Sequence, residues 1–146
     1  MMDYEVVTIS AREPWTTVAR GGDYLVVIEY HDGTWTWRAP EAPAAPARLK
    51  PDGRDEEGRW SLAPVGLGYP LPGVPRGALV GRTVDEEGRA GEPFLVGLGR
   101  TVGPFPRVSP GYFLIQLGPN ILSPPRARGA IRVRLRRRRR EEEEAL

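Results

Sequence analysis

The stretch YPLPGVPRGALVGR, residues 69–82, has three prolines and three glycines in fourteen positions and ends in a short apolar run. Proline fixes φ and stiffens the chain in an extended path, whereas glycine permits the backbone conformations of tight turns. The apolar run at 78–80 lies between two glycines, which is typical of a short buried strand. We therefore expect an extended loop that turns at Gly77 and enters a core strand.

Further strand-like runs are spread along the chain between Gly- and Pro-rich segments. Glycine and proline total 34 residues (18 plus 16), and no segment before the C-terminal tail has the period of an α-helix. The runs rich in β-branched and aromatic residues are 4–10, 24–30, 34–37, 78–84, 94–98, 112–117 and 130–136. Many short strands between turns predict an all-β protein, a β-sandwich of two antiparallel sheets.

Residues 38–68 form the longest segment without a strand-like run. The segment begins with closely spaced prolines, which predicts an exposed, extended loop. The pentapeptide DEEGR occurs at 55–59 and again at 85–89. Its paired carboxylates could belong to a metal or acid–base site, but Gly58 and Gly88 favour exposed turns in which these glycines have positive φ.

The charge is divided unevenly along the chain. Residues 1–92 carry ten basic and fifteen acidic side chains, whereas residues 93–140 carry eleven arginines and no acid. Four glutamates then follow, and the whole chain has a net charge of +2. The two parts are expected to attract each other, within one domain or between copies.

Several functional classes are disfavoured by what the sequence lacks. Its 146 residues suffice for one domain, and without cysteine they hold no disulfide, catalytic thiolate or Cys-bound zinc. His31 is the single histidine and lies in HDG, where we expect a turn. No serine lies in a nucleophile-elbow motif and no phosphate-binding loop is present, so we expect no enzyme activity.

The first residues show no basic start followed by an apolar region, so no Sec signal peptide is expected. No apolar run is long enough to insert into a membrane. The expected location is the cytoplasm, or outside the cell by a non-Sec route or as part of an assembly.

The order of motifs along the chain carries a family resemblance. The motifs are GD (22–23), GTWT (33–36), GALVGR (77–82), PFLVG (93–97), PGYFLIQL (110–117) and GAIRVRL (129–135). This order resembles the PA-I galactophilic lectin family (LecA-like domains) over residues 4–135. The resemblance implies a jelly-roll-type, galactose-binding-domain-like sandwich of two four-stranded sheets. It divides the chain into a LecA-like domain at 1–136, which contains the 38–68 loop, and a charged tail at 137–146.

The resemblance also implies sugar binding through a calcium ion held by the last loop. When the loop is anchored on Gly129, the family's Asp position falls on Pro119, its Thr position on Ser123 and its Asn pair on Arg126 and Ala127. Asn120 is one place out of register. Calcium requires several oxygen ligands, and the loop offers two cations, Arg126 and Arg128, and no carboxylate. We therefore predict that residues 118–128 hold no calcium and that no other cofactor is required.

A sugar could still be recognised by the loops at this tip. Tryptophan rings commonly stack on sugar faces. Trp15 and Trp35 are expected in the core, while Trp37 lies at the edge of the long loop and Trp60 within it. The candidate carbohydrate-binding residues are Trp37, Arg38, Asn120, Ser123 and Arg126.

The final strand has the clearest alternation in the chain. Ile131, Val133 and Leu135 point to one face, and Arg132, Arg134 and Arg136 to the other. The candidate partner-binding residues are Arg132, Arg134, Arg136, Arg137 and Arg138. Nucleic acid is an unlikely partner, because four glutamates follow the arginine run and no aromatic residues are interleaved with it.

Two functions remain open. The first is a non-enzymatic, lectin-like module that recognises carbohydrate with its tip loops. The alternative is a structural or assembly subunit that makes protein–protein contacts in a homo-oligomer or a larger complex. In either case the partner is a carbohydrate or another protein surface.

Overall fold

The computed structural model describes residues 4–22, 24–39, 47–104, 113–122 and 124–139. These residues form nine strands and one short 3-10 turn, so the predicted all-β class is confirmed. The strands are β1 (Glu5–Ser10), β2 (Thr16–Gly21), β3 (Tyr24–Trp37), β4 (Ala47–Leu49), β5 (Leu79–Asp85), β6 (Phe94–Leu95), β7 (Gly99–Val102), β8 (Phe113–Pro119) and β9 (Arg128–Arg139), and the 3-10 turn is η1 (Pro124–Arg126).

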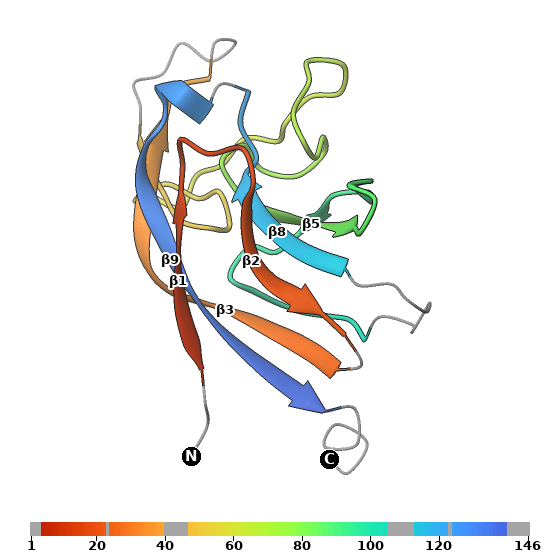
Figure 1. The fold of residues 1–146 in the computed structure, drawn as a ribbon. Helices are drawn as coiled ribbons and strands as arrows, with labels where there is room; N and C mark the ends of the chain where they lie inside the picture. Colours follow the sequence, from red (N-terminus) through yellow and green to blue (C-terminus); the bar gives the residue numbers. More distant parts are fainter. Residues whose placement is uncertain (1–3, 23, 40–46, 105–112, 123, 140–146) are drawn as a thin grey trace.

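The strands form two antiparallel sheets that pack face to face, which confirms the predicted β-sandwich (Figure 1). The first sheet has the order β1-β9-β3-β4, with β7 also paired to β3, and the second has the order β2-β8-β5-β6. The first sheet therefore has five described strands rather than the four that the lectin resemblance implies. The jelly-roll subtype stays a prediction. In the described part of the chain, no helix has the length and apolar character needed to cross a bilayer.

Strand β3 corrects the prediction of two separate strands divided by a turn at His31. It runs without interruption through both predicted segments, and β9 pairs with it from Tyr24 to Thr36. A register shift between Tyr30 and Asp32 accommodates His31 as an exposed bulge residue. The long ladder with β9 keeps the HDG segment extended, although its composition favours a turn.

Three described strands, β2, β4 and β7, have no counterpart among the predicted runs. Each is short, and β2 and β7 contain Gly and Arg, which weaken the composition signal of a strand. The predicted run at 94–98 is also reduced to the two residues of β6. These strands exist because long neighbours, mainly β3 and β8, give them a ladder to join.

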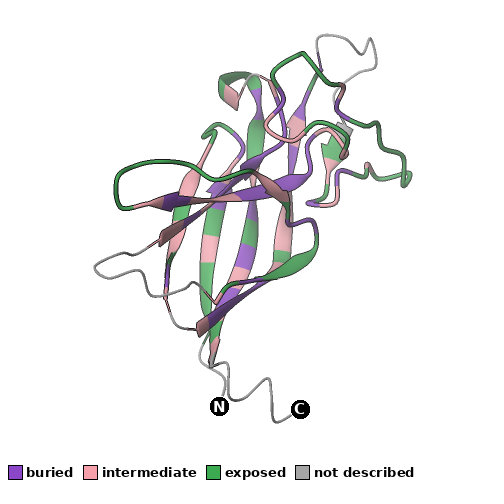
Figure 2. Ribbon diagram, turned by 90° about the vertical axis from the view of Figure 1, so that its right-hand side faces the viewer, coloured by how far each residue is buried: buried purple, intermediate pink, exposed green. Residues whose placement is uncertain are grey.

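The core lies between the two sheets. Along several strands, buried residues that face this core alternate with more exposed residues on the outer side (Figure 2). Trp35 is 1% exposed and its indole nitrogen donates to the Gly77 carbonyl at 2.7 Å. Leu79 and Val80, which follow Gly77, are fully buried in β5. Gly77 itself has a φ of 77°, so the turn into a core strand is confirmed as predicted.

Candidate functional site

Strand β9 presents a line of arginines on the outer face of the first sheet. Ile131, Val133 and Leu135 are buried toward the second sheet, so the alternate side chains point away from the core. We call these outward side chains the arginine row: Arg128, Arg132, Arg134, Arg136 and Arg138. Successive alternate positions lie about 6.6–6.8 Å apart along a strand.

Arg132 is fixed by a carboxylate of its own sheet. Its Nε donates to Asp32 Oδ1 at 2.5 Å, and its Nη2 donates to Asp32 Oδ2. The bulge in β3 brings Asp32 opposite Arg132 in the register. The hydrogen bonds and charge of Arg132 lower the pKa of the Asp32 carboxyl, and the same pairing raises the pKa of Arg132.

Glu29 serves two arginines at once. Its carboxylate lies 3.5 Å from Arg134 Nη2 and 3.7 Å from Arg136 Nε. The Arg134 guanidinium also lies over the Tyr4 ring, 5.6 Å from its centroid, and its Nε is buried without a hydrogen-bond partner. These four residues line an open hollow of about 360 Å³ on the outer face.

The arginine row is not neutralised by its own sheet. It has five arginines, while β1, β3 and β9 present only Glu29 and Asp32 as carboxylates on the same face. Arg128 and Arg138 have no carboxylate partner among the described residues. Strand β3 supplies two carboxylates to the row, so its charge is partly compensated, but a positive surplus remains.

Arg137 leaves the row, although the sequence groups it with its neighbours. It stands opposite Val26 in the register, so it faces inward at the open end of the sandwich. Its guanidinium lies 5.2 Å from the centroid of the Tyr24 ring. Strand β9 continues to Arg139, so three arginines assigned to the charged tail belong to the sheet, while residues 140–146 lie outside the described residues.

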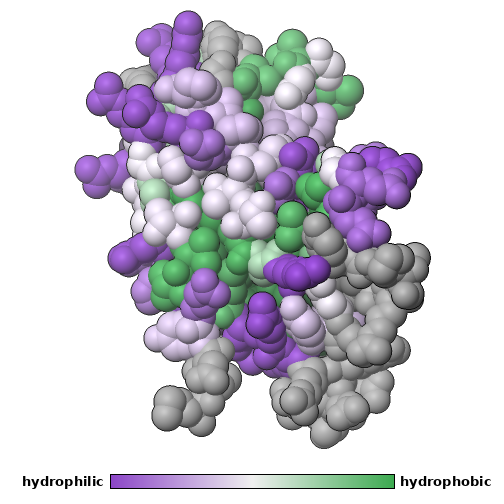
Figure 3. Space-filling view, viewed as in Figure 1, coloured by the Kyte–Doolittle hydropathy of each residue, from purple (hydrophilic) through white to green (hydrophobic). Residues whose placement is uncertain are grey.

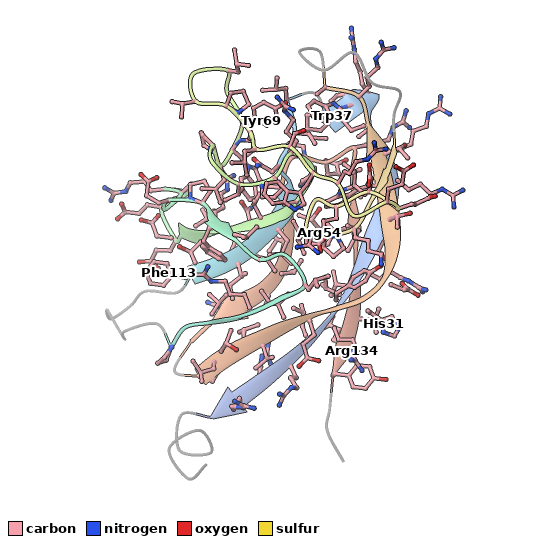
Figure 4. All side chains as sticks on the ribbon, turned by 180° about the vertical axis from the view of Figure 1, so that it is seen from behind. His31, Trp37, Arg54, Tyr69, Phe113 and Arg134 are labelled. Atoms are coloured by element: carbon pink, nitrogen blue, oxygen red, sulfur yellow. The ribbon has the colours of Figure 1, made fainter. Side chains whose placement is uncertain are left out.

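The second candidate surface, the tip loops, is arranged differently from the expectation. Trp37 is only 6% exposed and packs edge-on against Tyr69, with ring centroids 5.9 Å apart. Figure 4 shows Trp37 and Tyr69 together near the loop end of the molecule, and Arg134 toward the other end. A ring buried in this way offers no open face for a sugar to stack on.

Asn120 is fully buried and its side chain is saturated with hydrogen bonds. Its Oδ1 accepts from Leu71 N at 2.9 Å, and its Nδ2 donates to Leu71 O at 2.9 Å and to Pro75 O at 3.2 Å. Its backbone N–H donates to Ala78 O at 2.9 Å. Asn120 therefore fixes the proline-rich stretch to the end of β8 and leaves no free oxygen at the surface.

The remaining tip candidates differ in exposure from Trp37 and Asn120, which are both buried. Arg38 and Arg126 are exposed, and Ser123 lies outside the described residues. Nowhere in the described ranges do three His, Asp or Glu side chains group together as metal ligands would. Trp60 of the long loop, which was not among the candidates, is an exposed aromatic residue with 48% of its surface accessible.

Sequence reasoning also missed the acidic partners of the arginine row. A signal was present, because Glu29 is a lone acid in the apolar run YLVVIEY and Asp32 follows three residues later. The bulge at His31 decides which face Asp32 reaches, and the sequence pattern gives no sign of that bulge.

No protein-family model matches the chain, and neither curated proteins nor solved structures gave a significant match. The likeness to the PA-I family therefore rests on the quoted motifs alone.

Proposed function

We propose that this protein is a non-catalytic binding module whose arginine row docks on an acidic surface of another protein chain. The observation that carries the proposal is the excess of positive charge on one sheet face, where five arginines stand against two carboxylates. A strand fixes the spacing of the Cα atoms from which these side chains extend, and carboxylates of β3 further hold Arg132 and Arg134.

The mixture of charges suits a protein partner better than a phosphate backbone. Glu29 and Asp32 stand within the row, where they would repel closely spaced phosphates. A protein surface can place carboxylates near Arg128 and Arg138, which have no carboxylate partner among the described residues, and avoid Glu29 and Asp32. The guanidinium group binds carboxylates with two parallel hydrogen bonds, which gives such a contact orientation as well as affinity.

The outer face also supplies apolar contact beneath the charges. Leu25 and Val27 are buried on this face, opposite Arg138 and Arg136 in the register. Arginine stems cover apolar surface while their heads stay in water. A docked partner would therefore bury both aliphatic stems and charges, which is typical of the arginines found in protein interfaces.

The test uses immobilised poly-L-glutamate as an acidic probe, read by biolayer interferometry, beside sedimentation of the protein alone. The variant Arg134→Glu with Arg138→Glu should lose binding, because it converts the surplus into a deficit. Wild-type binding should weaken as the salt concentration rises from about 0.05 M to about 0.5 M. The single variants Arg134→Glu and Arg138→Glu are measured as well, and their matched control is Arg89→Glu on the hairpin beyond β5, which makes the same charge change far from the row (Figure 1). Equal loss in the control variant, or none in the double variant, would refute the proposal.

Carbohydrate recognition is a second candidate, favoured by one observation. Trp60 exposes about half of its surface in the long loop, and tryptophan is a common platform for sugar rings. A glycan array run with calcium and with chelator tests this function. Carbohydrate recognition is supported if a sugar binds in the presence of chelator and Trp60→Ala abolishes that binding. An array without any binding would exclude the function for the sugars displayed.

A further inference from the structure

Strand β1 has one edge that pairs with no other strand. Its inner edge pairs with β9 along all six residues, from Glu5 with Leu135 to Ser10 with Ala130. Within the ranges that the structure describes, β1 stands at the end of its sheet and nothing pairs with its outer edge. An unpaired edge presents backbone N–H and C=O groups to any chain that can extend beside it.

The edge of β1 lacks most of the features that normally protect such strands, and its one charged residue, Glu5, lies at the start of the strand and points to the inner side. Its register with β9 is regular, and its sequence EVVTIS has neither proline nor lysine. The neighbouring edge strand β2 differs, because a bulge at Val18 interrupts its register and Arg20 stands near its end. Bulges and charged side chains are common protections against edge pairing, so β1 is the open edge of this seam.

The direction of the β1 backbone groups follows from one hydrogen bond. Ala11 N donates to Gly129 O at 3.1 Å, in line with the β1–β9 ladder. In an antiparallel pair only alternate residues bond to the partner strand, so the odd-numbered residues of β1 face β9. Val6 and Thr8 therefore direct their N–H and C=O groups to the open edge.

The two sides of the open edge differ in character. On the inner side, the seam between β1 and β2 contains an open hollow of about 440 Å³. Its walls combine the apolar residues Val18, Ala19, Val26 and Leu135 with Tyr4 and the charged residues Glu5, Arg136 and Arg137. Figure 3 shows apolar atoms exposed along this seam, surrounded by hydrophilic ones. On the outer side, the arginine row lies one strand away, on β9.

We propose that β1 accepts an extended segment of the partner protein as an added strand, in which acidic side chains alternate with apolar ones. This inference rests on the proposed function of the arginine row. The acidic side chains would lie on the outer face, two strand spacings or about 10 Å from the row, with Val6 and Thr8 of β1 between them, and the apolar ones would face the seam hollow. Main-chain hydrogen bonds to Val6 and Thr8 would provide affinity, as in other cases of strand addition.

A second copy of this chain fits the edge less well than an acidic segment. Pairing of two β1 strands would place Tyr4, Val6 and Thr8 on the outer face, and none of them is acidic. It would also bring two arginine rows to a separation of about 14 Å, three strand spacings. Their mutual repulsion opposes such a dimer, whereas an acidic strand is attracted.

The test uses an end-capped octapeptide of alternating glutamate and valine, with fluorescence anisotropy as the readout. Thr8→Pro removes an outward N–H and leaves the bonds of β1 to β9 in place, so binding should weaken about tenfold or more. Thr8→Val keeps the N–H and should change binding by less than about twofold. A peptide of alternating lysine and valine should not bind. A second measurement uses the unaltered protein, in case Thr8→Pro does not fold. The same glutamate–valine peptide is N-methylated at alternate residues on one edge, and it should no longer bind.

The possible outcomes separate the two proposals. In one outcome, Arg134→Glu loses binding, whereas Thr8→Pro and the N-methylated peptide bind as before. This result would overturn strand addition and leave the proposed role of the arginine row standing. Unchanged binding in all of them would overturn both proposals. If the wild-type protein forms a dimer and Thr8→Pro dissociates it, a second copy of the chain occupies the β1 edge. This result would also overturn the proposal of an added acidic strand.

Discussion

The side chain of Asn120 binds both backbone groups of Leu71, with one hydrogen bond in each direction and both of 2.9 Å. Asn120 follows β8 directly, whereas Leu71 lies in the proline-rich stretch before β5. A side-chain amide has the same donor and acceptor arrangement as a peptide group, so it replaces the strand partner that this stretch lacks. The third bond, to Pro75 O, extends the contact toward Gly77.

Replacing Asn120 by alanine should destabilise the fold by about 2–4 kcal/mol, because three half-buried backbone groups of Leu71 and Pro75 lose their partners and the fully buried side chain leaves a void. The free energy of unfolding, measured with guanidinium chloride, checks this value. Gln116→Ala is the control, since Gln116 also uses its amide for two side-chain bonds but lies half-buried. We expect a cost of about 1 kcal/mol or less for the control. Equal losses in both variants would contradict the role given to Asn120.

Gly77 connects three parts of the structure at one backbone position. Its carbonyl accepts from Trp35 Nε1 and its N–H donates to Asn120 O at 2.8 Å. Its φ of 77° is costly for any residue with a Cβ, and a Cβ there would meet the Leu49 side chain. Gly77→Ala should therefore cost clearly more than the about 1–2 kcal/mol expected for the conformation alone.

The control for this second prediction lies four residues earlier. Gly73 also has a positive φ, 86°, but a Cβ there would meet nothing within 4 Å. Gly73→Ala should show only the conformational cost, of about 1–2 kcal/mol. Chemical denaturation of both variants gives the comparison, and a Gly77→Ala protein no less stable than Gly73→Ala would exclude the packing contribution of Leu49.

The features that the sequence predicted correctly depend on local chemistry. Gly58 and Gly88 of the two DEEGR segments have φ values of 77° and 83°, as a tight turn requires. In both turns the aspartate side chain, Asp55 or Asp85, accepts hydrogen bonds from the backbone N–H groups two and four residues later. The alternation in β9 was equally readable, because each residue of a strand fixes the face of the next.

The features that the sequence did not predict depend on distant partners. Trp37 stands beside a long loop, but Tyr69 covers its ring from 32 positions away in the sequence. Asn120 was placed among the ligand candidates by the register of the lectin resemblance, whereas its contacts are with Leu71 and Pro75. Such pairings follow from the way the sheets stack, and no local pattern encodes them.

Asp32→Asn should make the stability of the protein less dependent on pH in acid. The pKa of Asp32 is lowered in the folded state, first by its hydrogen bond to Arg132, so the pair contributes stability above the ordinary value of 3.8. This contribution falls away as the pH drops through the lowered pKa. Urea denaturation from pH 7 to pH 2.5 should show a wild-type advantage that is constant above about pH 5 and shrinks below about pH 4.

The control for the acid experiment is an exposed acid outside the arginine row. Glu86 lies in the second DEEGR turn, and Glu86→Gln removes the same charge without touching Arg132. Its stability should follow the wild-type curve more closely than that of Asp32→Asn. An Asp32→Asn protein whose disadvantage persists unchanged down to pH 2.5 would show that the carboxylate is not the group that titrates.

Replacing Ile131 by alanine should cost about 2–4 kcal/mol, because the side chain is fully buried between the sheets. Arg128 is the control, since it lies three positions earlier in β9 and is exposed on the outer face. Arg128→Ala should change stability by less than about 0.5 kcal/mol. Thermal and chemical denaturation of the two variants measure the difference. Similar costs at both positions would contradict the inward and outward assignment of β9.

Trp60 should dominate the quenching of tryptophan fluorescence by acrylamide. The quencher reaches rings in proportion to their exposure, and Trp60 is 48% exposed, against 1% for Trp35 and 6% for Trp37. Trp15, which was expected in the core, is half-buried. Trp60→Phe should therefore lower the quenching constant of the folded protein, whereas Trp37→Phe should leave it unchanged or raise it. In guanidinium chloride the two variants should be quenched alike, since all rings are then accessible. A larger fall in Trp37→Phe would mean that the Trp37 ring is open to solvent, and it would restore Trp37 as a stacking platform for sugar.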